Sequence, residues 1–269
     1  TFDASVRRAS TGELGQGVLD WPFDVPHLRA EVGEAEGHVR IGWMRSVNNI
    51  QHAFAIGSFV DEIAHARGQD SREALLEIIG PPRLVSAAEA GVAALPNYGA
   101  PLAQHPIDTA RLRRVVERVT ERAGWASRGA RALGLAAHRS FLTYVAMVLE
   151  VERSPRGVRV KEAWIAADAG LVVNPDRVRA QLEGALVFGM SLALHGELTA
   201  THGAIVQTNF RDYPVVRLPE VPHRIHIDLV PSDAPPGGVG EPGVPPVAPA
   251  LANAVAALTG QRLRELPLR

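Results

Sequence analysis

The stretch that decides the fold, residues 133–168, reads LGLAAHRSFLTYVAMVLEVERSPRGVRVKEAWIAAD. Its apolar and β-branched residues form three runs, which are interrupted by short segments that contain Ser, Pro and Gly. Runs of this kind, separated by turn-forming residues, are typical of β-strands. The sequence therefore predicts strands at 133–138, 144–152 and 158–168, and two further runs of the same character predict strands at 204–210 and 223–229.

Apolar residues at helical spacing and capping residues predict helices on both sides of these strands. The predicted helices cover 52–66, Ser71 to Ile79 with Ser71 as the cap, Asp108 or Thr109 to Gly124, the residues from Asn174-Pro175 to about 193, and 248–258. Asn174 is a suitable cap before a proline at the first helical position, and Gly260 is typical of a helix end. Residues 86–107 are expected to form a loop.

The order of these elements, helices first and then strands with inserted helices, predicts an α+β fold of mixed sheets with packed helices. Residues 1–40 are rich in turn formers and charge, and we expect a connecting arm with one strand near 28–32. The remainder, 41–269, is expected to have a helical part at about 50–125 and a strand-rich part at about 130–269.

The composition excludes several classes of function. The 269 residues carry 28 basic and 29 acidic side chains, so the net charge of −1 provides no field for nucleic acid or an anionic membrane. The absence of cysteine excludes disulfides, thiolate zinc sites and cysteine-ligated iron–sulfur clusters in this chain. No run approaches the roughly 18 apolar residues of a membrane span, and the charged first residues indicate no signal peptide. The compartment stays open between cytoplasm and periplasm.

One carboxylate lies at the centre of a stiff loop near the end of the sequence. Residues 238–243 read GVGEPG, which matches the letters of a dinucleotide-binding fingerprint. Pro242 and the prolines after it remove the amide donors that a pyrophosphate group needs, so this function is excluded. The rigid mounting of Glu241 suits a general base, which must be held close to the proton that it takes. Glu241 equally suits a structural role before the last helix, whose positive end favours a carboxylate.

Three further polar residues are candidates for binding. Gln181 is predicted to point inward, because it shares a helical stripe with residues 178, 182, 185 and 189. Either neighbouring backbone or a polar cofactor would satisfy such a buried amide. Arg45 and Ser46 precede the first helix, where free amides bind anionic groups; an exposed arginine is the alternative. His223 and His226 fall on opposite faces of a strand, so they are a poor metal pair.

Several motifs follow one another along the chain. They are GWMRSV at 42–47, Ala53-Phe54 with SFVDE at 58–62, HRSF at 138–141, DAG at 168–170 with Asn174-Pro175, QLEG at 181–184 and GEPG at 240–243. In this order they resemble the large subunit of molybdenum hydroxylases, the family of xanthine dehydrogenase and aldehyde oxidase. The isoquinoline 1-oxidoreductase branch is the most similar, above all in GEPGVPPVAPALANA at 240–254. The resemblance extends from about 18 to 268 and matches only the C-terminal half of that subunit.

The resemblance implies an enzyme that hydroxylates an aldehyde or an N-heteroaromatic carbon with oxygen from water. Glu241 matches the general base that deprotonates a molybdenum-bound hydroxide. The positions that match cofactor contacts are Gln181, Arg45, Ser46, Val47, Ser140, Phe141 and Gly240. The implied cofactor is molybdopterin carrying molybdenum, in its plain form or its cytosine dinucleotide form, and no residue of this chain is expected to ligate the metal.

The resemblance also implies partner chains. A complementary polypeptide would carry the N-terminal half of the large subunit, and a separate subunit would carry iron–sulfur clusters, in agreement with the absence of cysteine here. The substrate would be a small molecule.

The chain departs from the usual family pattern at five positions around the expected pterin groove. Relatives usually carry Gly at 48, 142 and 185, Glu at 57 and Cys at 169, where this chain has Asn48, Leu142, Ala185, Gly57 and Ala169. Each change alters volume or polarity, and a groove packed to protein density has little spare volume.

Two other classes of function stay open on the sequence alone. The chain starts at Thr1 instead of Met, and a threonine hydroxyl beside its own amine is a competent nucleophile. A cofactor-free relative processed at Thr1 would then be an N-terminal-nucleophile hydrolase. A non-catalytic subunit that stabilises an assembly is the third reading.

Overall fold

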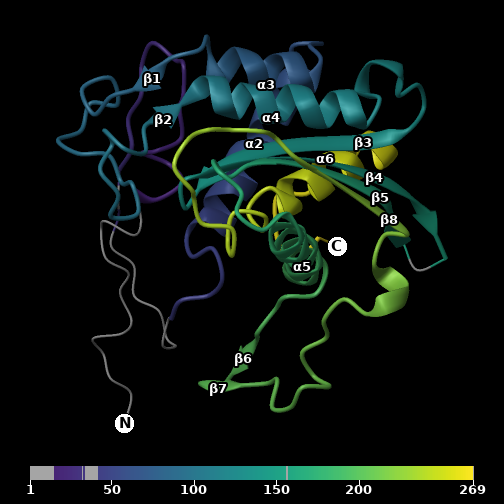
Figure 1. The fold of residues 1–269 in the computed structure, drawn as a ribbon. Coiled ribbons are helices and arrows are strands. Elements are labelled where there is room, and N and C mark those ends of the chain that lie inside the picture. Colours follow the sequence, from purple (N-terminus) through teal and green to yellow (C-terminus); the bar gives the residue numbers. More distant parts are fainter. Residues whose placement is uncertain (1–14, 32, 34–41, 156, 269) are drawn as a thin grey trace.

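A computed structural model describes residues 15–31, 33, 42–155 and 157–268, and its centre is a four-stranded sheet (Figure 1). In spatial order the strands are β3 (Ala132–Ser140), β4 (Thr143–Ser154), β5 (Gly157–Asp168) and β8 (Arg224–Leu229). The first three are antiparallel neighbours, and β8 pairs with β5 in parallel. The mixed sheet and four of the six predicted strands are confirmed.

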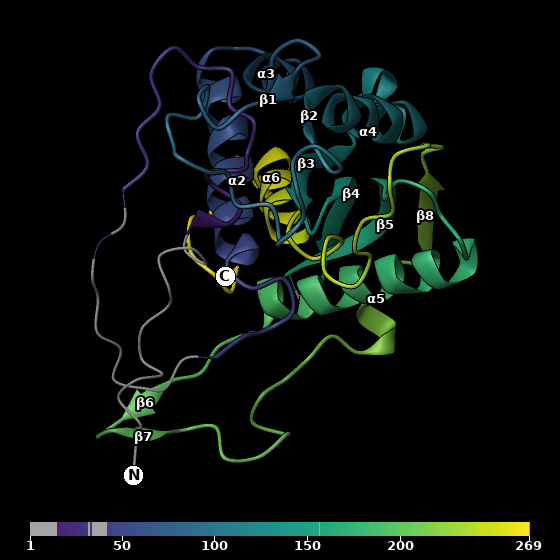
Figure 2. The same cartoon turned by 60° about the vertical axis from the view of Figure 1, so that its left-hand side comes forward.

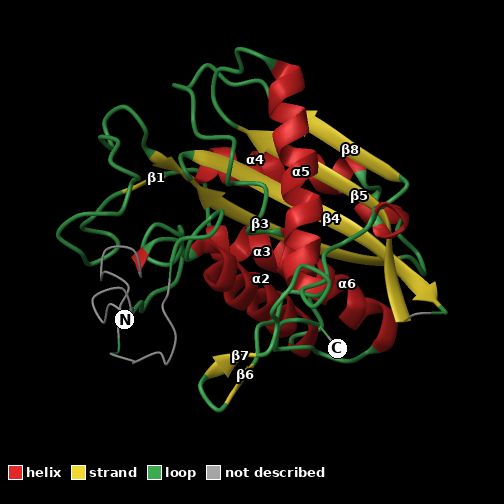
Figure 3. Cartoon of the chain, turned by 90° about the horizontal axis from the view of Figure 1, so that it is seen from below, coloured by secondary structure: helices red, strands yellow, loops and turns green. Residues whose placement is uncertain are grey.

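Helices cover both faces of this sheet, as Figures 1 and 2 show. One face is covered by α3 (Ser71–Ile79) and α4 (Thr109–Arg122), and the other by α5 (Pro175–Leu194) and α6 (Val247–Thr259). Helix α2 (Asn49–Ala66) runs beside β3, between α3 and α6. Figure 3 shows the sheet from the side of α5, with that helix crossing the strands. The predicted helices and the α+β fold class are confirmed.

Local capping explains where these helices begin. Asp108 and Asn174 accept hydrogen bonds from backbone amides two and three residues ahead, as their N-cap positions predict. Ser71 is not the cap of α3, because Asp70 takes this role and accepts from the Arg72 amide at 2.9 Å. Asp70 has the extended backbone of an N-cap, from which its carboxylate reaches the free amides of the first turn, whereas Ser71 lies one residue inside the helix.

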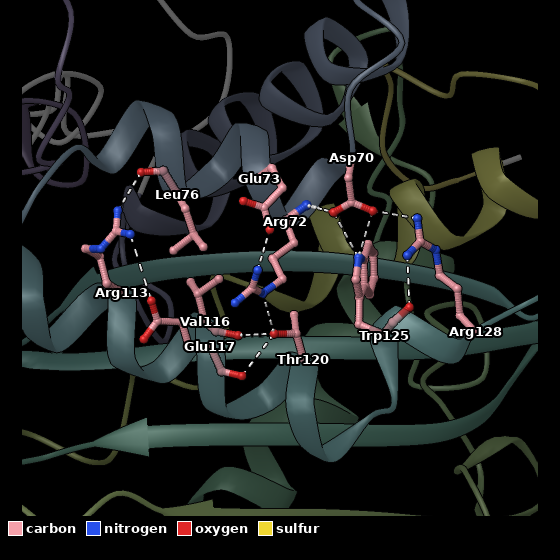
Figure 4. Close-up of polar contacts among 10 residues, drawn as sticks. All are labelled: Asp70, Arg72, Glu73, Leu76, Arg113, Val116, Glu117, Thr120, Trp125 and Arg128. Atoms are coloured by element: carbon pink, nitrogen blue, oxygen red, sulfur yellow. Dashed lines mark hydrogen bonds and ion pairs between the residues drawn. The ribbon is translucent and has the colours of Figure 1, made fainter.

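The cap of α3 also joins that helix to the segment after α4 (Figure 4). Asp70 accepts from Trp125 Nε1 at 3.0 Å and from Arg128 Nη2 at 2.6 Å, and the Arg128 guanidinium lies over the Trp125 ring. Arg72 reaches the Thr120 hydroxyl on α4 at 3.1 Å. These contacts hold the two helices of this layer together.

Two strand predictions fail. Residues 28–31 are irregular, while residue 32 lies outside the described residues. Of the run 204–210, only Ala204–Ile205 is extended, as β7 in a small exposed hairpin with β6 (Ala200–Thr201). Its alternating pattern has no sheet face to cover, because the hairpin projects away from the central sheet (Figure 2).

The predicted loop 86–107 is confirmed for most of its length, with one exception at its end. Ile107 pairs with Val85 in a two-stranded ladder of β1 (Leu84–Val85) and β2 (Ile107–Asp108). Both side chains are buried together with Leu95, so the loop closes over a small apolar cluster of its own. None of the described helices is long and apolar enough to cross a membrane.

Helix α6 packs on β3 with backbone against backbone. A Cβ atom added at Gly134 would lie 2.1 Å from the Ala250 carbonyl oxygen and 2.2 Å from the Ala254 nitrogen. Neither atom can move without displacing the helix, so only glycine allows this approach. Asn253 fixes the contact from the helix side, where its Nδ2 donates to the Leu135 carbonyl at 3.0 Å.

A buried polar cluster closes the end of β3 beside α2. Asp20 pairs with Arg139 at 3.2 Å, and both side chains are almost completely buried. His138 Nε2 lies 3.0 Å from Asn49 Oδ1, while no hydrogen-bond partner of His138 Nδ1 occurs among the described residues. Burial, together with the nearby charges of His52 and Arg139, lowers the pKa of His138 to about 3. His138 is therefore neutral in the folded chain.

Gly134→Ala should displace α6 and destabilise the chain by about 3 kcal/mol, because the added methyl group meets helix backbone. Gly184 on α5 is the matched control, since its nearest neighbour is the end of the Arg45 side chain at 3.9 Å. Gly184→Ala should stabilise the chain by about 0.5–1 kcal/mol through its higher helix propensity. Urea unfolding of both variants gives the two values, and equal values would contradict the backbone contact.

The pH dependence of stability should report on His138. Its folded pKa is depressed from 6.5 to about 3, so the unfolded chain binds more protons between these values. The resulting stability is complete above pH 6.5 and is lost as the pH falls toward 3, by up to about 1.4 kcal/mol per pH unit.

Urea unfolding of the wild type and of His138→Leu at several pH values between 7 and 4 checks this slope. The free energy of unfolding of the wild type, relative to that of His138→Leu, should fall by up to about 1.4 kcal/mol for each pH unit as the pH falls. His65→Gln, at an exposed position of α2, serves as the control and should leave the slope of the wild type intact. Parallel curves for wild type and His138→Leu would contradict the assignment.

Candidate functional site

Glu241 lies on the loop of residues 237–246, which connects the region after β8 to α6. Before Glu241 the loop is joined to the β3–β4 turn, where the Gly238 amide donates to the Phe141 carbonyl at 2.8 Å. The Thr143 hydroxyl donates to the Gly238 carbonyl at 2.6 Å. The loop therefore has a fixed position on the sheet three residues before its carboxylate.

Behind Glu241 the loop rests on α5. A Cβ atom at Gly243 would lie 2.7 Å from the Cβ of Ala185, so the two residues are in direct contact across loop and helix. The Val244 amide donates to the Glu241 carbonyl at 3.0 Å and turns the chain toward α6. Ala185 is completely buried beneath this turn. The methyl group that departs from the family pattern thus fills the space beneath the loop.

Arg45 and Ser46 contact the backbone on either side of the Gly240–Glu241 peptide bond. Arg45 Nε donates to the Gly240 carbonyl at 2.6 Å, and Ser46 Oγ donates to the Glu241 carbonyl at 2.7 Å. Arg45 Nη2 also donates to the Gln181 carbonyl and to Gln181 Oε1, both at 3.2 Å. Five of the predicted site residues, from three distant parts of the sequence, meet at this point.

The prediction that Gln181 points inward is wrong. Its side chain is exposed, while Val178, Leu182 and Ala185 of the same helix are buried. At 100° per residue, position 181 falls at the margin of the buried stripe, about 100° from the middle of that stripe. The amide therefore faces the surface, where Arg45 holds its oxygen and leaves its nitrogen with no protein acceptor among the described residues.

The two predicted cofactor-lining turns share an unusual backbone conformation. Ser46 and Val47 have φ values of 75° and 49°, and Phe141 and Leu142 have φ values of 48° and 69°. Left-handed φ angles cost non-glycine residues about 1–2 kcal/mol each, and surrounding contacts must maintain them. Leu142 thus occupies a position that favours glycine, the residue usual in the family.

Ser140 and Phe141 differ in their access to the surface. The Ser140 side chain is completely buried, and its hydroxyl has no hydrogen-bond partner among the described residues. Phe141 is partly exposed and packs on the Tyr98 ring with a centroid distance of 4.6 Å. Both residues are thus linked to the Glu241 loop only through the Phe141–Gly238 hydrogen bond.

The Glu241 carboxylate is partly exposed and forms no hydrogen bond or ion pair with any described residue. Its charge acts on Arg45, whose pKa is lowered by partial burial, and the carboxylate opposes this change. A Cβ atom at Gly240 would meet nothing within 4 Å, so the residue before the carboxylate faces open space on this chain. Glu241 is available to a proton donor from outside.

Sequence reasoning missed the groups that support this site from behind. Asn49 Nδ2 donates to the Ser46 carbonyl at 3.1 Å, and its Oδ1 receives hydrogen bonds from His138 and from the Tyr98 hydroxyl. Asn49 adjoins the motif at 42–47, but two of its partners, His138 and Tyr98, lie far away in the sequence. No spacing rule links residues so distant.

The other candidates from the sequence have structural partners. His226 bonds to Glu162 at 2.6 Å and stacks on Trp164, and His223 lies outside β8. Asp168 is buried and pairs with Arg111 at 2.6 Å. Within the described ranges, no group of three His, Asp or Glu side chains is placed to hold a metal ion.

One of the remaining departures from the expected pattern, at position 57, has a packing explanation. A Cβ atom at Gly57 would lie 2.8 Å from the Pro249 Cβ, so a glutamate there would force α2 and α6 apart. Ala169 is buried, and its carbonyl accepts from the Gly237 amide at 2.8 Å. Asn48 has a side-chain amide nitrogen that is buried without a partner among the described residues, which the packing does not explain.

Comparison with known proteins shows which sequences and folds this chain is similar to. Residues 107–222 match the family model of a molybdopterin cofactor-binding domain. The isoquinoline 1-oxidoreductase subunit beta of Brevundimonas diminuta is 34% identical over 92% of this chain and 29% of its own length. A membrane-bound aldehyde dehydrogenase [pyrroloquinoline-quinone] of Gluconacetobacter polyoxogenes is 33% identical over 92% of this chain and 31% of its own length.

The fold has a counterpart among solved structures. The aldehyde oxidoreductase from Desulfovibrio gigas matches with a TM-score of 0.66 and 13% identity, over 85% of this chain and 41% of that chain. The chain spans less than a third of the length of the two curated relatives. Gln181, Ser140 and Phe141 lie inside the range matched by the domain model. The chain belongs to the family of molybdopterin-binding subunits that includes those of xanthine dehydrogenase and aldehyde oxidoreductase.

Proposed function

We propose that this chain is part of a molybdenum-dependent oxidoreductase that hydroxylates an aldehyde or N-heteroaromatic carbon with oxygen from water. Glu241 is its general base. The observation that carries the proposal is the convergence of Glu241, Gln181 and Arg45 on one open surface, in a chain that contains a molybdopterin-binding domain. These three residues lie up to 196 positions apart, and no local pattern would bring them together.

The residues present fit a molybdopterin at this surface. The Glu241 carboxylate and the Gln181 amide nitrogen have no protein partner among the described residues, and the space beside Gly240 is open. Gln181 would hold the cofactor at its metal end, and the partly exposed Phe141 would adjoin the pterin, whereas the completely buried Ser140 has no surface to offer it. When bound, the group supplies an electron-accepting metal centre that this chain's side chains lack.

The chain's own residues then have distinct tasks. Glu241 takes a proton on its carboxylate, which is the work of a general base within hydrogen-bond reach. Arg45, Ser46 and Val47 form the turn that holds the loop backbone, and Gly240 leaves room beside the carboxylate for substrate and cofactor. Because Arg45 bonds to main-chain oxygens, it places the loop without occupying the carboxylate.

The complete enzyme requires more polypeptide. We propose a complementary chain that carries the N-terminal half of the large subunit and an iron–sulfur subunit that removes electrons, since this sequence has no cysteine. The cofactor is the plain or the cytosine dinucleotide form. The names of the relatives, isoquinoline 1-oxidoreductase and aldehyde dehydrogenase, suggest the two substrate classes. The hydrolase alternative rests on Thr1, which lies outside the described residues, and no observation favours the non-catalytic one.

The purified complex that contains this chain should hold molybdenum and a pterin, close to one of each per copy of the chain. Metal analysis and identification of the released fluorescent pterin check this content. One curated relative is named with pyrroloquinoline-quinone, so the same sample is also analysed for that quinone. A complex with the quinone and no molybdenum would contradict the proposal.

Glu241→Gln should lower turnover by about a hundredfold or more while molybdenum and pterin content stay unchanged, because the amide cannot take a proton. Glu183→Gln removes an exposed glutamate of α5, two residues beyond Gln181, and is the control for a lost surface charge. It should retain full turnover. Steady-state kinetics of both complexes decide the matter, and a fully active Glu241→Gln complex would exclude the general-base role.

A further inference from the structure

Asn49, the first residue of α2, is a completely buried amide with three side-chain contacts. Its Nδ2 donates to the Ser46 carbonyl at 3.1 Å, while its Oδ1 accepts from His138 Nε2 at 3.0 Å and from the Tyr98 hydroxyl at 3.2 Å. The carbonyl partner fixes the orientation of the amide, so the proton of the neutral imidazole lies on Nε2. Every side-chain polar atom of Asn49 thus has a partner.

The contact with Ser46 supports a backbone conformation that does not persist by itself. Ser46 and Val47 both have left-handed φ angles, which surrounding contacts must enforce. The Ser46 carbonyl accepts from both the backbone amide and the side chain of Asn49, each at 3.1 Å. Asn49 therefore holds the turn from the α2 side.

Two routes lead from Asn49 to the Glu241 loop. Through the turn, the Ser46 hydroxyl bonds to the Glu241 carbonyl at 2.7 Å. Through Tyr98, the ring packs on Phe141, whose carbonyl accepts the Gly238 amide at 2.8 Å. The first route ends at the carboxylate residue itself, and the second ends three residues before it. Together they restrain both the position and the direction of this part of the loop.

Gly17 lies directly against the hydrogen bond between Asn49 and His138. Gly17 has a φ of 80°, and a Cβ atom there would lie 2.8 Å from Asn49 Oδ1 and 3.1 Å from His138 Nε2. Backbone thus covers the Asn49–His138 hydrogen bond directly. In such a water-poor environment a hydrogen bond holds its geometry more strictly than at the surface, and a lost partner is costly.

We propose that Asn49 is a positioning residue for Glu241, which it holds in place through the Ser46–Val47 turn and through Tyr98. This inference rests on the proposed role of Glu241. Asn49 touches neither substrate nor cofactor on this view, and its effect on the reaction passes entirely through the loop backbone. A displacement of the carboxylate by about 1 Å would suffice to lower turnover by up to about a hundredfold.

Hydrogen exchange of the full chain tests the mechanical part of this proposal without reference to activity. Asn49→Leu keeps the shape of the side chain and removes its hydrogen bonds. Exchange of the protected amides of Gly238 and Val244 should become about tenfold faster, because the loop loses its restraint. Asn253→Leu is the matched control, since Asn253 is also a buried side-chain amide, and its Nδ2 donates to the Gly57 and Leu135 carbonyls.

Asn253→Leu should destabilise the chain without a tenfold rise at these two amides, once the change in global stability is accounted for. If Asn49→Leu does not fold, Tyr98→Phe replaces it, since it removes the hydrogen bond of the Tyr98 hydroxyl to Asn49 and keeps the ring on Phe141. Its expected effect is smaller and in the same direction. Unchanged exchange at Gly238 and Val244 in the folded variant, or an equal rise in Asn253→Leu, would overturn the proposal.

Kinetics of the assembled complex supply the second readout. The Asn49 variant should lose about tenfold to a hundredfold in kcat with little change in KM, because the base is misplaced and the substrate pocket is not. A rise in KM alone would overturn the positioning role. If exchange responds as expected while Glu241→Gln keeps full turnover, the general-base function fails and the restraint of the loop by Asn49 stands.

Discussion

The contact between the α6 backbone and β3 at Gly134 is the constraint on which the rest of the structure depends. A helix without long side chains at the contact can approach the sheet this closely only where the strand has no Cβ. Two more glycines allow a close approach to the same helix. A Cβ atom added at Gly57 would contact Pro249, and one added at Gly189 would contact Val247. Helix α6 starts directly after the loop that carries Glu241. The distance between α6 and the sheet therefore determines the position of the last residue of that loop.

The site combines this rigid anchor with strained turns. The left-handed residues at 46–47 and 141–142 flank the loop from two sides and contact it through main-chain groups. Strain of this kind is retained where neighbouring contacts outweigh its cost, and the buried cluster around Asn49 and His138 supplies such contacts. The Gln181 amide nitrogen and the Glu241 carboxylate face outward and have no hydrogen-bond partner among the described residues.

Much of the fold could be predicted because its signals are local. Alternation and turn residues predicted the three central strands, and Asn174 and Gly260 marked helix ends that depend only on their neighbours. The run at 204–210 failed because a strand pattern becomes a strand only where a sheet accepts it. The prediction that Gln181 points inward failed because a residue at the margin of the buried face of α5 turns outward with a small rotation of the helix.

The candidate site was predictable in part. Motif resemblance indicated Arg45, Gln181 and Glu241, but not that Arg45 bonds to a carbonyl 195 residues away. The polar cluster around Asn49 and His138 could not be predicted from the sequence, because its hydrogen bonds join residues with no periodic relation.

Arg45 and Ser46 bind the loop through the carbonyl oxygens of residues 240 and 241, which every amino acid possesses. The scaffold is therefore indifferent to the identity of the side chain that it presents at position 241. A substitution at position 241 therefore leaves both hydrogen bonds in place, so the side chain on this loop can vary in evolution while the contacts that hold the loop persist.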